Sequence, residues 1–515
     1  MPDEVLWYHR TFSFHKTGDR VLLHFGAADY SCSVILNDRE IGTHKGGYLP
    51  FTFDITDSVR DGENNLQLRV VDPTDEGSQA RGKQRFQRGE IWYTPQSGIW
   101  QTVWLEEVCS LYIKDIRLKP DIDRGVLLAD ICGDFTENVE VTVLDEGNVK
   151  TTVMLPARKG EIPMEEFHLW CPEDPHLYDL EIRAGEDLVE SYFAMRKFST
   201  GKDSYGISRI MLNNKPYFMN GRLAQGYWSD GMYTAPSGEA LIYDIQTMKD
   251  LGFNTLRKHI KIEPLRWYYH CDRLGMIVWQ DIISGGGKYN RYAIDVFSIT
   301  AMRLKSKHLF MVRDWEKHRK FYARQDPEGI QEFYLDSENR IALLYNTPSI
   351  ALWPPMNEAW GQFDCLKVCD FYRKKDTIRL IDHASGWVDH GGGDINSFHI
   401  YHTDFKFYKF DKNDDRPLGL TEYGGYSIPM DGHVFNKEKE FGYQAYKNSQ
   451  DYNSAIGRLL REKICSAMHN QGLSAAIYTE VSDVEDELNG FLTYGREVLK
   501  VDPAIIREAN AELKL

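Results

Sequence analysis

The sequence predicts a protein of three parts: two strand-rich β-sandwiches followed by a barrel of alternating strands and helices. Short runs of alternating polar and apolar residues, separated by Gly and Asn-Asp turn signals, fill the first 200 residues. From about residue 201, strand-like runs alternate with helical runs, which is the pattern of a parallel sheet. The 515 residues also suffice for about three domains of roughly 100–200 residues each.

The first predicted domain covers residues 1–110 and reads as an antiparallel sandwich. Its turn signals are Asn-Asp, Gly-Gly and Asp-Gly pairs, and its runs alternate or are rich in β-branched residues. No helical periodicity interrupts them. Strands are expected at 20–25, 31–36, 49–55, 65–71 and 97–108.

The second predicted domain covers residues 111–200. It is about as long as one immunoglobulin-like sandwich of roughly 100 residues, and its pattern is again that of strands alone. Strands are expected at 112–118, 126–132, 139–144 and 178–184.

The third predicted domain, residues 201–515, reads as a (β/α)₈ barrel. Its first helix is expected at 237–251, where Leu241, Ile245 and Met248 recur at helical spacing and Gly252 ends the helix. Repeated strand–helix units of this length predict a parallel sheet, and eight of them predict a closed barrel. Strands are expected at 253–257, 276–280, 349–353, 386–389, 418–421 and 475–479.

Composition excludes several classes of partner. Lys plus Arg total 61 and Asp plus Glu total 77, so the formal net charge is 61 − 77 = −16. An acidic chain lacks the basic field that nucleic acids or anionic membranes require. No run approaches ~18 apolar residues, and the N-terminus has no signal-peptide pattern. We therefore expect a cytoplasmic protein with no nucleic-acid or membrane partner, and its eight cysteines are expected to be reduced thiols.

Two glutamates follow predicted barrel strands. Glu358 comes shortly after the strand at 349–353, and Glu422 directly follows the strand at 418–421. Polar residues at the carboxyl ends of barrel strands meet at one face, where barrel enzymes carry their chemistry. Paired carboxylates there are typical of glycoside hydrolysis, one as acid/base and the other as nucleophile or base. The alternative is that each Glu caps a helix or forms a surface ion pair.

Segments along nearly the whole chain resemble one known family. They are WYHRTF at 7–12, GGYLPF at 46–51, FDIT at 53–56, SGIW at 97–100, NTLR at 254–257, NE at 357–358 and TEYG at 421–424. In this order and spacing they resemble glycoside hydrolase family 2, the family of β-galactosidases, β-glucuronidases and β-mannosidases. The resemblance implies a jelly-roll sugar-binding domain, an immunoglobulin-like β-sandwich and a TIM barrel.

The resemblance also implies roles for five residues. Glu422 would be the nucleophile, Glu358 the general acid/base, and Asn357 would hold the sugar 2-hydroxyl. Arg257 and Tyr401 would support ionised Glu422, since a nucleophilic carboxylate needs a cation or hydrogen-bond donors. The acid needs a raised pKa instead, which the charge of Glu422 favours. We expect the two carboxyl groups about 5–5.5 Å apart, and hence retention of anomeric configuration.

Further candidates for substrate binding or support lie at predicted strand ends or, for His399, between two predicted strands. They are Lys258, His259, His399, Trp279, Asp281, Trp353 and Tyr478. A ring of Trp279 or Trp353 can stack on the apolar face of a pyranose, and packing in the core is the alternative for both. Tyr478 stands where the family usually has a Trp. No acidic cluster predicts a metal ion, and no cofactor is expected.

Departures from the family pattern bear on the sugar. Trp92 stands where many galactosidases and glucuronidases carry an Asp, and no Asn-x-Lys pattern follows Asn489, which counts against ordinary β-glucuronidase activity. The segment Trp279-Gln280-Asp281 is closer to the mannosidase-like pattern. Cations nevertheless gather near the predicted mouth, and they leave a uronide such as a β-galacturonide as an alternative. They are Lys258, His259, Lys261, Arg81, Lys83 and Arg85.

We therefore expect a retaining exo-β-glycosidase that acts on an oligosaccharide or glycoconjugate, with a β-galactoside as the default substrate. A uronide- or mannoside-specific member is the alternative, and a carbohydrate-binding pseudoenzyme is the competing class. A homo-oligomer is left open, because relatives are frequently dimers. The WYRRxF-like segment begins at Trp7, where relatives have more chain before it, so the first sandwich is expected to lack leading strands.

Overall fold

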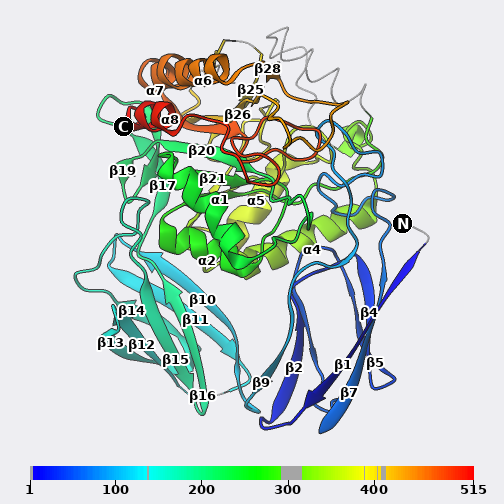
Figure 1. The fold of residues 1–515 in the computed structure, drawn as a ribbon. Coiled ribbons are helices and arrows are strands. Elements are labelled where there is room, and N and C mark those ends of the chain that lie inside the picture. The colour runs from blue at the N-terminus through cyan, green and yellow to red at the C-terminus, as the bar shows by residue number, and fades with distance from the viewer. Residues whose placement is uncertain (1–3, 136–137, 291–315, 388, 403, 408–412) are drawn as a thin grey trace. The chain divides into compact units, whose positions relative to one another are not determined.

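The computed structural model describes residues 4–135, 138–290, 316–387, 389–402, 404–407 and 413–515 (Figure 1). The chain divides into two compact units. The first unit comprises Met1–Thr74, Gln96–Lys197 and Glu338–Pro348. The second unit comprises Asp75–Pro95, Phe198–Ser337 and Ser349–Leu515.

The first unit begins with antiparallel sheets formed by strands β1 to β9. One sheet has the order β1-β7-β4-β5 and another the order β6-β2-β9, while β3 pairs with β8. Inward-facing residues such as Val21, Leu23, Val34 and Val70 form their common core. The strands are β1 (Val5–Phe14), β2 (Arg20–Phe25), β3 (Ala28–Asp29), β4 (Ser31–Leu36), β5 (Arg39–Lys45), β6 (Phe51–Asp54), β7 (Gly62–Val71), β8 (Gly98–Ile99) and β9 (Val103–Val108).

The same unit contains a second pair of antiparallel sheets, with orders β10-β11-β14 and β13-β12-β15-β16. Alternate residues of β12 and β15 are buried, as Val139, Val141 and Val143 show, because successive side chains of a strand point to opposite faces. The elements are β10 (Ile113–Asp121), β11 (Val126–Gly133), β12 (Val139–Asp145), β13 (Asn148–Leu155), η1 (Pro156–Arg158), β14 (Lys159–Pro163), β15 (Tyr178–Ala184) and β16 (Asp187–Phe193).

The second unit is built on an eight-stranded parallel sheet with the order β24-β23-β22-β21-β20-β29-β26-β25. This order runs around a barrel in chain sequence. Among the described residues, no hydrogen-bonded ladder joins β24 to β25. The strands are β20 (Met219–Ala224), β21 (Thr255–Lys258), β22 (Ile277–Gln280), β23 (Ile350–Trp353), β24 (Leu380–Ile381), β25 (Asn396–Ile400), β26 (Leu418–Gly424) and β29 (Leu473–Thr479).

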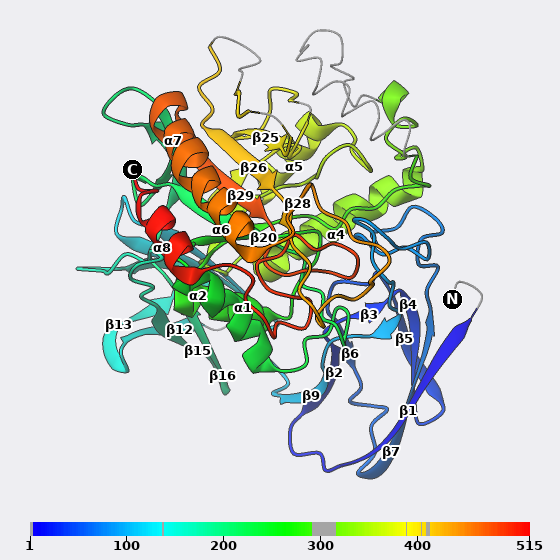
Figure 2. The ribbon, with the colours of Figure 1, turned by 45° about the horizontal axis from the view of Figure 1, so that its top comes forward.

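Helices accompany the barrel strands of the second unit (Figure 2). The first, α1, begins where the Ser237 hydroxyl accepts the backbone N–H of Ala240, and it buries Leu241, Ile245 and Met248 as the periodicity predicted. The helices are α1 (Gly238–Asp250), α2 (Leu265–Leu274), η3 (Glu316–His318), α4 (Pro327–Leu344), α5 (Cys365–Lys375), α6 (Ser449–Arg458), the π-helical η4 (Leu459–Ile464), α7 (Cys465–Gln471) and α8 (Pro503–Ala511). Small additional sheets are β17 (Phe198–Lys202), β18 (Ser208–Leu212) and β19 (Lys215–Pro216), and the pair β27 (Tyr426–Ser427) and β28 (Gln444–Ala445).

The fifth and sixth barrel strands differ from the expectation. A strand was predicted at 386–389, but Gly386, Trp387 and Asp389 lie outside any strand, and residue 388 lies outside the described residues. The structure instead has the two-residue β24 and, after it, β25. Strand β24 is too short to show periodicity. Strand β25 is buried at every position although it contains Asn396, Ser397 and His399. These polar residues remove the apolar run that would identify a buried strand in the sequence.

Segment Asp75–Pro95 belongs to the second unit although it lies between strands of the first. The backbone N–H groups of Arg81 and Gly82 donate to Ser284 O at 3.0 and 2.9 Å, after β22. Near its other end, the backbone N–H of Thr94 donates to Glu485 Oε1 at 2.9 Å, after β29. The segment is therefore fastened to two loops that leave the carboxyl ends of barrel strands. None of the described helices is long and apolar enough to cross a membrane.

Close packing in the barrel wall gives a stability test at Gly221 of β20. A Cβ atom there would lie 2.5 Å from Thr255 O and 2.8 Å from Ile477 Cδ1. Gly221→Ala should lower the free energy of unfolding by about 1–3 kcal/mol, as overpacking does. Gly238→Ala is the control, since its Cβ would meet nothing within 4 Å. Chemical denaturation measures both, and equal stability of the two variants would contradict the packing argument.

Candidate active site

Glu422 lies near the end of β26 with a side chain only 6 % exposed. Its two oxygens have different partners. Arg257 Nη1 donates to Oε1 at 3.0 Å, and the Tyr401 hydroxyl donates to Oε2 at 2.7 Å. The carboxylate is thus held by a cation from β21 and by a hydroxyl that follows β25.

Arg257 is fully buried and uses its guanidinium to join several strand ends. Besides Glu422, its Nε donates to the Asp281 carboxylate at 2.9 Å, and its Nη2 donates to Asn357 Oδ1 at 2.9 Å. Its Nη1 also donates to Thr421 O at 3.1 Å. One side chain therefore fixes residues that follow β22 and β23 and residues of β26.

His259 completes the arrangement around Asp281. Its Nδ1 lies 2.6 Å from Asp281 Oδ2. Burial, and then the positive charges of Lys83 and Arg257, lower the pKa of His259 well below its usual value. The ring is therefore neutral near pH 7 and donates an N–H to Asp281. Burial raises the pKa of Asp281, while the Arg257 guanidinium opposes that rise.

The environment of Glu422 favours the ionised form. Burial alone would raise its pKa, but the charges of His399 and Arg257 and the hydrogen bond from Tyr401 outweigh burial and lower the pKa to about 2. Burial also raises the pKa of Tyr401 well above its usual value, so its hydroxyl remains a donor. Glu422 is thus a carboxylate throughout the physiological range.

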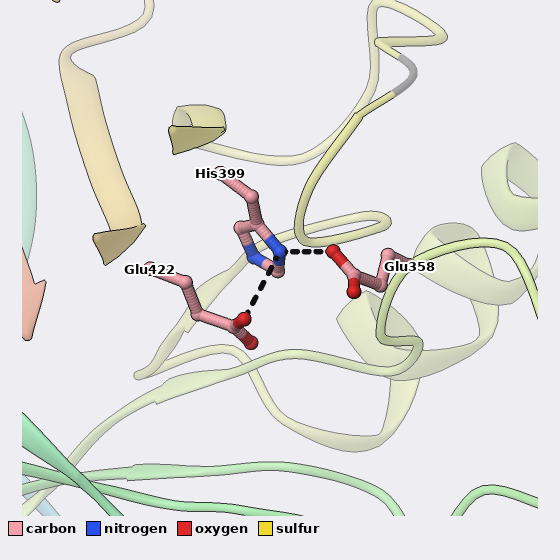
Figure 3. A group of neighbouring side chains, drawn as sticks. All are labelled: Glu358, His399 and Glu422. Atoms are coloured by element: carbon pink, nitrogen blue, oxygen red, sulfur yellow. Dashed lines mark hydrogen bonds and ion pairs between the residues drawn. The ribbon is translucent and has the colours of Figure 1, made fainter. Parts of the chain in front are cut away.

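Glu358 follows β23 and faces Glu422 across the ring of His399 (Figure 3). The Nδ1 atom of His399 makes a very short hydrogen bond with Glu358 Oε2 and lies 3.3 Å from Glu422 Oε2. One oxygen of each carboxyl group lies within 4.8 Å of the other. Burial and the negative charge of Glu422 raise the pKa of Glu358, although His399 opposes them. The two carboxyl groups therefore have opposite pKa shifts.

His399 is positioned by its other ring nitrogen. Its Nε2 lies 2.9 Å from Ser385 Oγ and 3.5 Å from Arg257 Nη1. Ser385 Oγ is in turn 2.9 Å from Thr421 Oγ1. These contacts fix the ring plane so that Nδ1 points between the two glutamates. Within the described residues, Glu358, His399 and Glu422 also form a group whose ligand atoms are close enough to hold a metal ion. An ion there would occupy the atoms that the two glutamates need for chemistry.

Tyr401 is braced by an aromatic neighbour that the sequence did not reveal. Its ring stacks on Tyr443 with 3.7 Å between centroids, and its hydroxyl also lies 3.0 Å from Thr479 Oγ1. Tyr443 lies between β27 and β28, far along the chain from Tyr401, so no local spacing signals this contact. The brace keeps the hydroxyl aimed at Glu422.

Three aromatic candidates do not present a ring to a substrate in this structure. Trp279 and Tyr478 are 0 % exposed and Trp353 is 2 % exposed. The indole N–H of Trp279 donates to Met219 Sδ, and that of Trp353 donates to Asp376 at 2.8 Å. Of the two alternatives for Trp279 and Trp353, this burial and these hydrogen bonds favour core packing over a stacking platform. The Tyr478 hydroxyl accepts the backbone N–H of residue 426.

Lys258 also differs from the expectation. Its ammonium is buried, donates to Glu263 at 2.7 Å and lies 4.6 Å from the ring centre of Trp267 on α2. Lys261 binds the same Glu263 at 3.0 Å. Lys258 follows Arg257 on one strand, and successive side chains of a strand point to opposite faces. The structure therefore brings Arg257 to the site and directs Lys258 away from it.

Comparison with known proteins identifies the family of this chain. The family model described as "Glycosyl hydrolase 2 galactose-binding domain-like" matches residues 1–102, and "Glycosyl hydrolases family 2, TIM barrel domain" matches residues 206–454. The chain belongs to glycoside hydrolase family 2. The predicted galactose-binding-like and TIM-barrel parts of this family 2 chain are thereby confirmed.

Relatives of this family 2 chain carry several activities in their names. A β-galactosidase of Leuconostoc mesenteroides is 23 % identical over 387 residues, which cover 70 % of this chain and 33 % of the relative. A β-glucuronidase of Paenibacillus borealis is 23 % identical over 401 residues, covering 73 % of this chain and 62 % of the relative. The chain spans about a third of the length of the first curated relatives that it matches.

Solved structures show the fold of this family 2 chain over nearly its whole length. A β-glucuronidase from an uncultured Clostridium species has a TM-score of 0.75 at 17 % identity, covering 98 % of this chain and 88 % of that one. A β-galacturonidase from Eisenbergiella tayi has a TM-score of 0.70 at 17 % identity, with the same coverage. At this identity the likeness concerns the fold alone.

The central role of Arg257 gives a stability test. Arg257→Leu leaves the carboxylates of Asp281 and Glu422 buried without their cation, which should cost roughly 3–5 kcal/mol in the unfolding of the barrel. The cost should shrink in acid, because protonation removes the uncompensated charges. Arg124→Leu is the control, since it breaks an exposed ion pair with Glu161 worth about 0–1 kcal/mol. Denaturant midpoints at pH 7 and pH 5 measure both, and equal losses would contradict the assignment.

Proposed function

We propose that the chain is a retaining exo-β-glycosidase in which Glu422 is the nucleophile and Glu358 the general acid/base. The observation that carries this proposal is the pair of carboxyl groups within 4.8 Å of each other, with the pKa of one lowered and that of the other raised. Opposite pKa values allow one group to attack while the other donates a proton. Their short separation favours retention over inversion, which needs room for a water molecule.

The first step forms a glycosyl-enzyme. A Glu422 carboxylate oxygen attacks the anomeric carbon as the bond from that carbon to the leaving oxygen breaks, and Glu358 gives its proton to that oxygen. In the second step, Glu358 takes a proton from water, whose oxygen attacks the same carbon and releases Glu422 as a carboxylate. Two inversions at one carbon leave the configuration unchanged.

The change of role of Glu358 follows from electrostatics. The negative charge of Glu422 helps to raise the pKa of Glu358 before reaction. Formation of the ester removes that charge, so the pKa of Glu358 falls and the group can act as a base. Glu422 is affected in the opposite sense. Arg257 and Tyr401 both stabilise its ionised form, so Glu422 is an effective leaving group in the second step.

Asn357 supports substrate binding in this proposal. Its Oδ1 accepts a hydrogen bond from Arg257 Nη2, so its side-chain NH₂ is the group left to donate to a sugar hydroxyl. The resemblance to the family indicates the 2-hydroxyl. Hydrogen bonds at that position strengthen in the oxocarbenium-like transition state, which is why they affect turnover.

The substrate is proposed as a terminal β-linked hexopyranose of an oligosaccharide or glycoconjugate. The relatives and solved neighbours named above comprise galactosidases, glucuronidases and a galacturonidase, whose sugars differ at C4 and at C6. The β-galactoside default, the uronide and mannoside alternatives, a cytoplasmic location and a homo-oligomer all stay predictions. The pseudoenzyme alternative is disfavoured because both glutamates and their supporting partners are in place.

A panel of nitrophenyl β-glycosides tests the proposal directly. Glu422→Gln should reduce kcat on the best substrate by roughly 10³-fold or more, because the amide cannot form the glycosyl-enzyme. NMR of the early wild-type product should show the β-anomer first. Glu440→Gln, an exposed carboxylate of the same unit, is the control and should retain wild-type turnover. Wild-type turnover of Glu422→Gln, or an α-anomer as first product, would reject the assignment.

The Tyr401 hydroxyl gives a test of how the nucleophile is kept ionised. Tyr401→Phe removes a donor to Glu422, so the pKa of Glu422 should rise and the acid limb of the kcat/KM profile should move to higher pH. Tyr423→Phe is the control, since its buried hydroxyl lies beside Glu422 in sequence and lacks a hydrogen-bond partner among the described residues. An unmoved acid limb in Tyr401→Phe would contradict this role.

A further inference from the structure

Segment Asp75–Pro95 carries four cations, and three of them have structural partners. Arg88 Nη1 lies 3.5 Å from Glu485 Oε2 and 3.3 Å from Asp486 Oδ1. Arg81 Nη1 donates to Gly286 O at 2.9 Å, and its guanidinium lies 4.9 Å from the ring centre of Trp360. Arg85 lies 3.8 Å from Asp75 and 4.9 Å from the ring centre of Trp92. These three side chains hold the segment together and are not free to bind a ligand.

Lys83 is different. Its side chain is half-buried, and within the described residues its ammonium makes no hydrogen bond and has no carboxylate within 4.0 Å. Its ammonium lies 5.5 Å from the centre of the Tyr93 ring. The backbone is well fixed, since the Tyr93 N–H donates to Lys83 O at 3.0 Å. Lys83 is therefore a positioned cation with no counter-ion among the described residues.

The anchoring of the segment places Lys83 at the mouth of the barrel. Its immediate neighbours Arg81 and Gly82 are bonded to Ser284, after β22, and Tyr93 donates its hydroxyl to Glu487, after β29. The charge of Lys83 accordingly acts on groups of the candidate site from several strands. They are His259, Asp281, Glu358 and Glu480.

Glu480 is a carboxyl group of the chain that could neutralise Lys83, but its environment opposes this. It directly follows β29, is 0 % exposed, and neither of its oxygens has a hydrogen-bond partner among the described residues. Burial, and then the negative charge of Glu487, raise its pKa well above the usual value. The environment of Glu480 therefore favours its neutral form, and among the described residues Glu480 makes no ion pair with Lys83.

The other cations expected near the mouth already have ion-pair partners. Lys258 and Lys261 share Glu263 as a buried counter-ion, and Arg257 is committed to Asp281 and Glu422. A half-buried ammonium pairs strongly with a carboxylate and gains much less from a neutral hydroxymethyl group. The charge balance of the described site thus favours an anionic sugar.

We propose that Lys83 binds the carboxylate of an anionic sugar, so that the substrate is a terminal β-linked hexuronide. This inference rests on the proposed glycosidase function and makes Lys83 its specificity-determining residue. A hexuronide differs from the corresponding neutral hexoside by a carboxylate in place of the hydroxymethyl group at C6. The Asn-x-Lys pattern absent after β29 is thereby replaced by a lysine from Asp75–Pro95.

The test compares nitrophenyl β-galacturonide and β-glucuronide with the matching β-galactoside and β-glucoside. Wild-type protein should prefer a uronide. Lys83→Met should lower kcat/KM on that uronide roughly 10- to 100-fold, mainly through KM, and should lose much less on the neutral sugar. Lys288→Met, which removes an exposed lysine after β22, is the matched control and should match wild type. Glu480→Gln should keep the preference for the uronide, because the substitution preserves the neutral form that the raised pKa of Glu480 favours.

Several outcomes would overturn the inference. They are a wild-type preference for the neutral hexoside, an equal loss of Lys83→Met on both sugars, or an unchanged uronide activity in that variant. Calorimetric binding of free galacturonate and glucuronate, compared with galactose and glucose, gives a readout that needs no turnover. If Lys83→Met loses uronate binding, the uronate subsite is supported even where Glu422→Gln contradicts the proposed chemistry. Failure of the subsite and failure of the proposed function can therefore be told apart.

Discussion

The candidate site depends on the burial of one guanidinium. Arg257 has no exposed surface, and its donors are met by Asp281, Asn357, Glu422 and a backbone carbonyl. A buried cation of this kind is tolerated only when its charge and donors are fully matched, since the desolvation cost is several kcal/mol. These hydrogen bonds hold the carboxyl ends of β21, β22, β23 and β26 in fixed positions relative to one another. The same contacts that stabilise the barrel therefore aim the carboxyl groups.

The two glutamates differ because their surroundings differ. Glu422 accepts hydrogen bonds from Arg257 and Tyr401. Among the described residues, the Glu358 carboxyl group is hydrogen-bonded only to the ring of His399, and its side chain is more exposed, at 18 % against 6 % for Glu422. Donors and a cation favour the charged form of the first, and burial beside a negative charge favours the neutral form of the second. The two pKa values therefore differ because of the residues that surround each carboxyl group, since the two side chains are chemically identical.

The sequence predicted the strand ends well where strands are apolar. β21, β22, β23, β26 and β29 were all expected within a few residues, because their buried runs are hydrophobic. Strand β25 was missed because several of its buried residues, such as His399, are polar and show no apolar run. Their hydrogen-bond partners come from elsewhere in the chain. Glu358, Glu422 and Arg257 could be placed because each stands at the end of a recognisable strand.

Other site features could not be read from the sequence, since they depend on which face of a strand a side chain uses. Lys258 and Arg257 are neighbours, and a one-residue difference reverses their directions. Trp279 and Trp353 stand at strand ends as a stacking residue would, but their indole N–H groups are bonded within the wall. The Tyr443 brace on Tyr401 joins distant segments through a loop, so neither spacing nor composition signals it.

The charge of Lys83 also bears on the acid. In the free protein its positive charge lowers the pKa of Glu358 and so opposes the protonated form that the first step requires. A substrate carboxylate paired with Lys83 would cancel that charge, and the pKa of Glu358 would then rise as the complex forms. A neutral sugar would leave the opposition in place. On this argument an anionic substrate is favoured in binding and also in the protonation of Glu358, so a smaller part of the selectivity appears in kcat beside the main effect on KM.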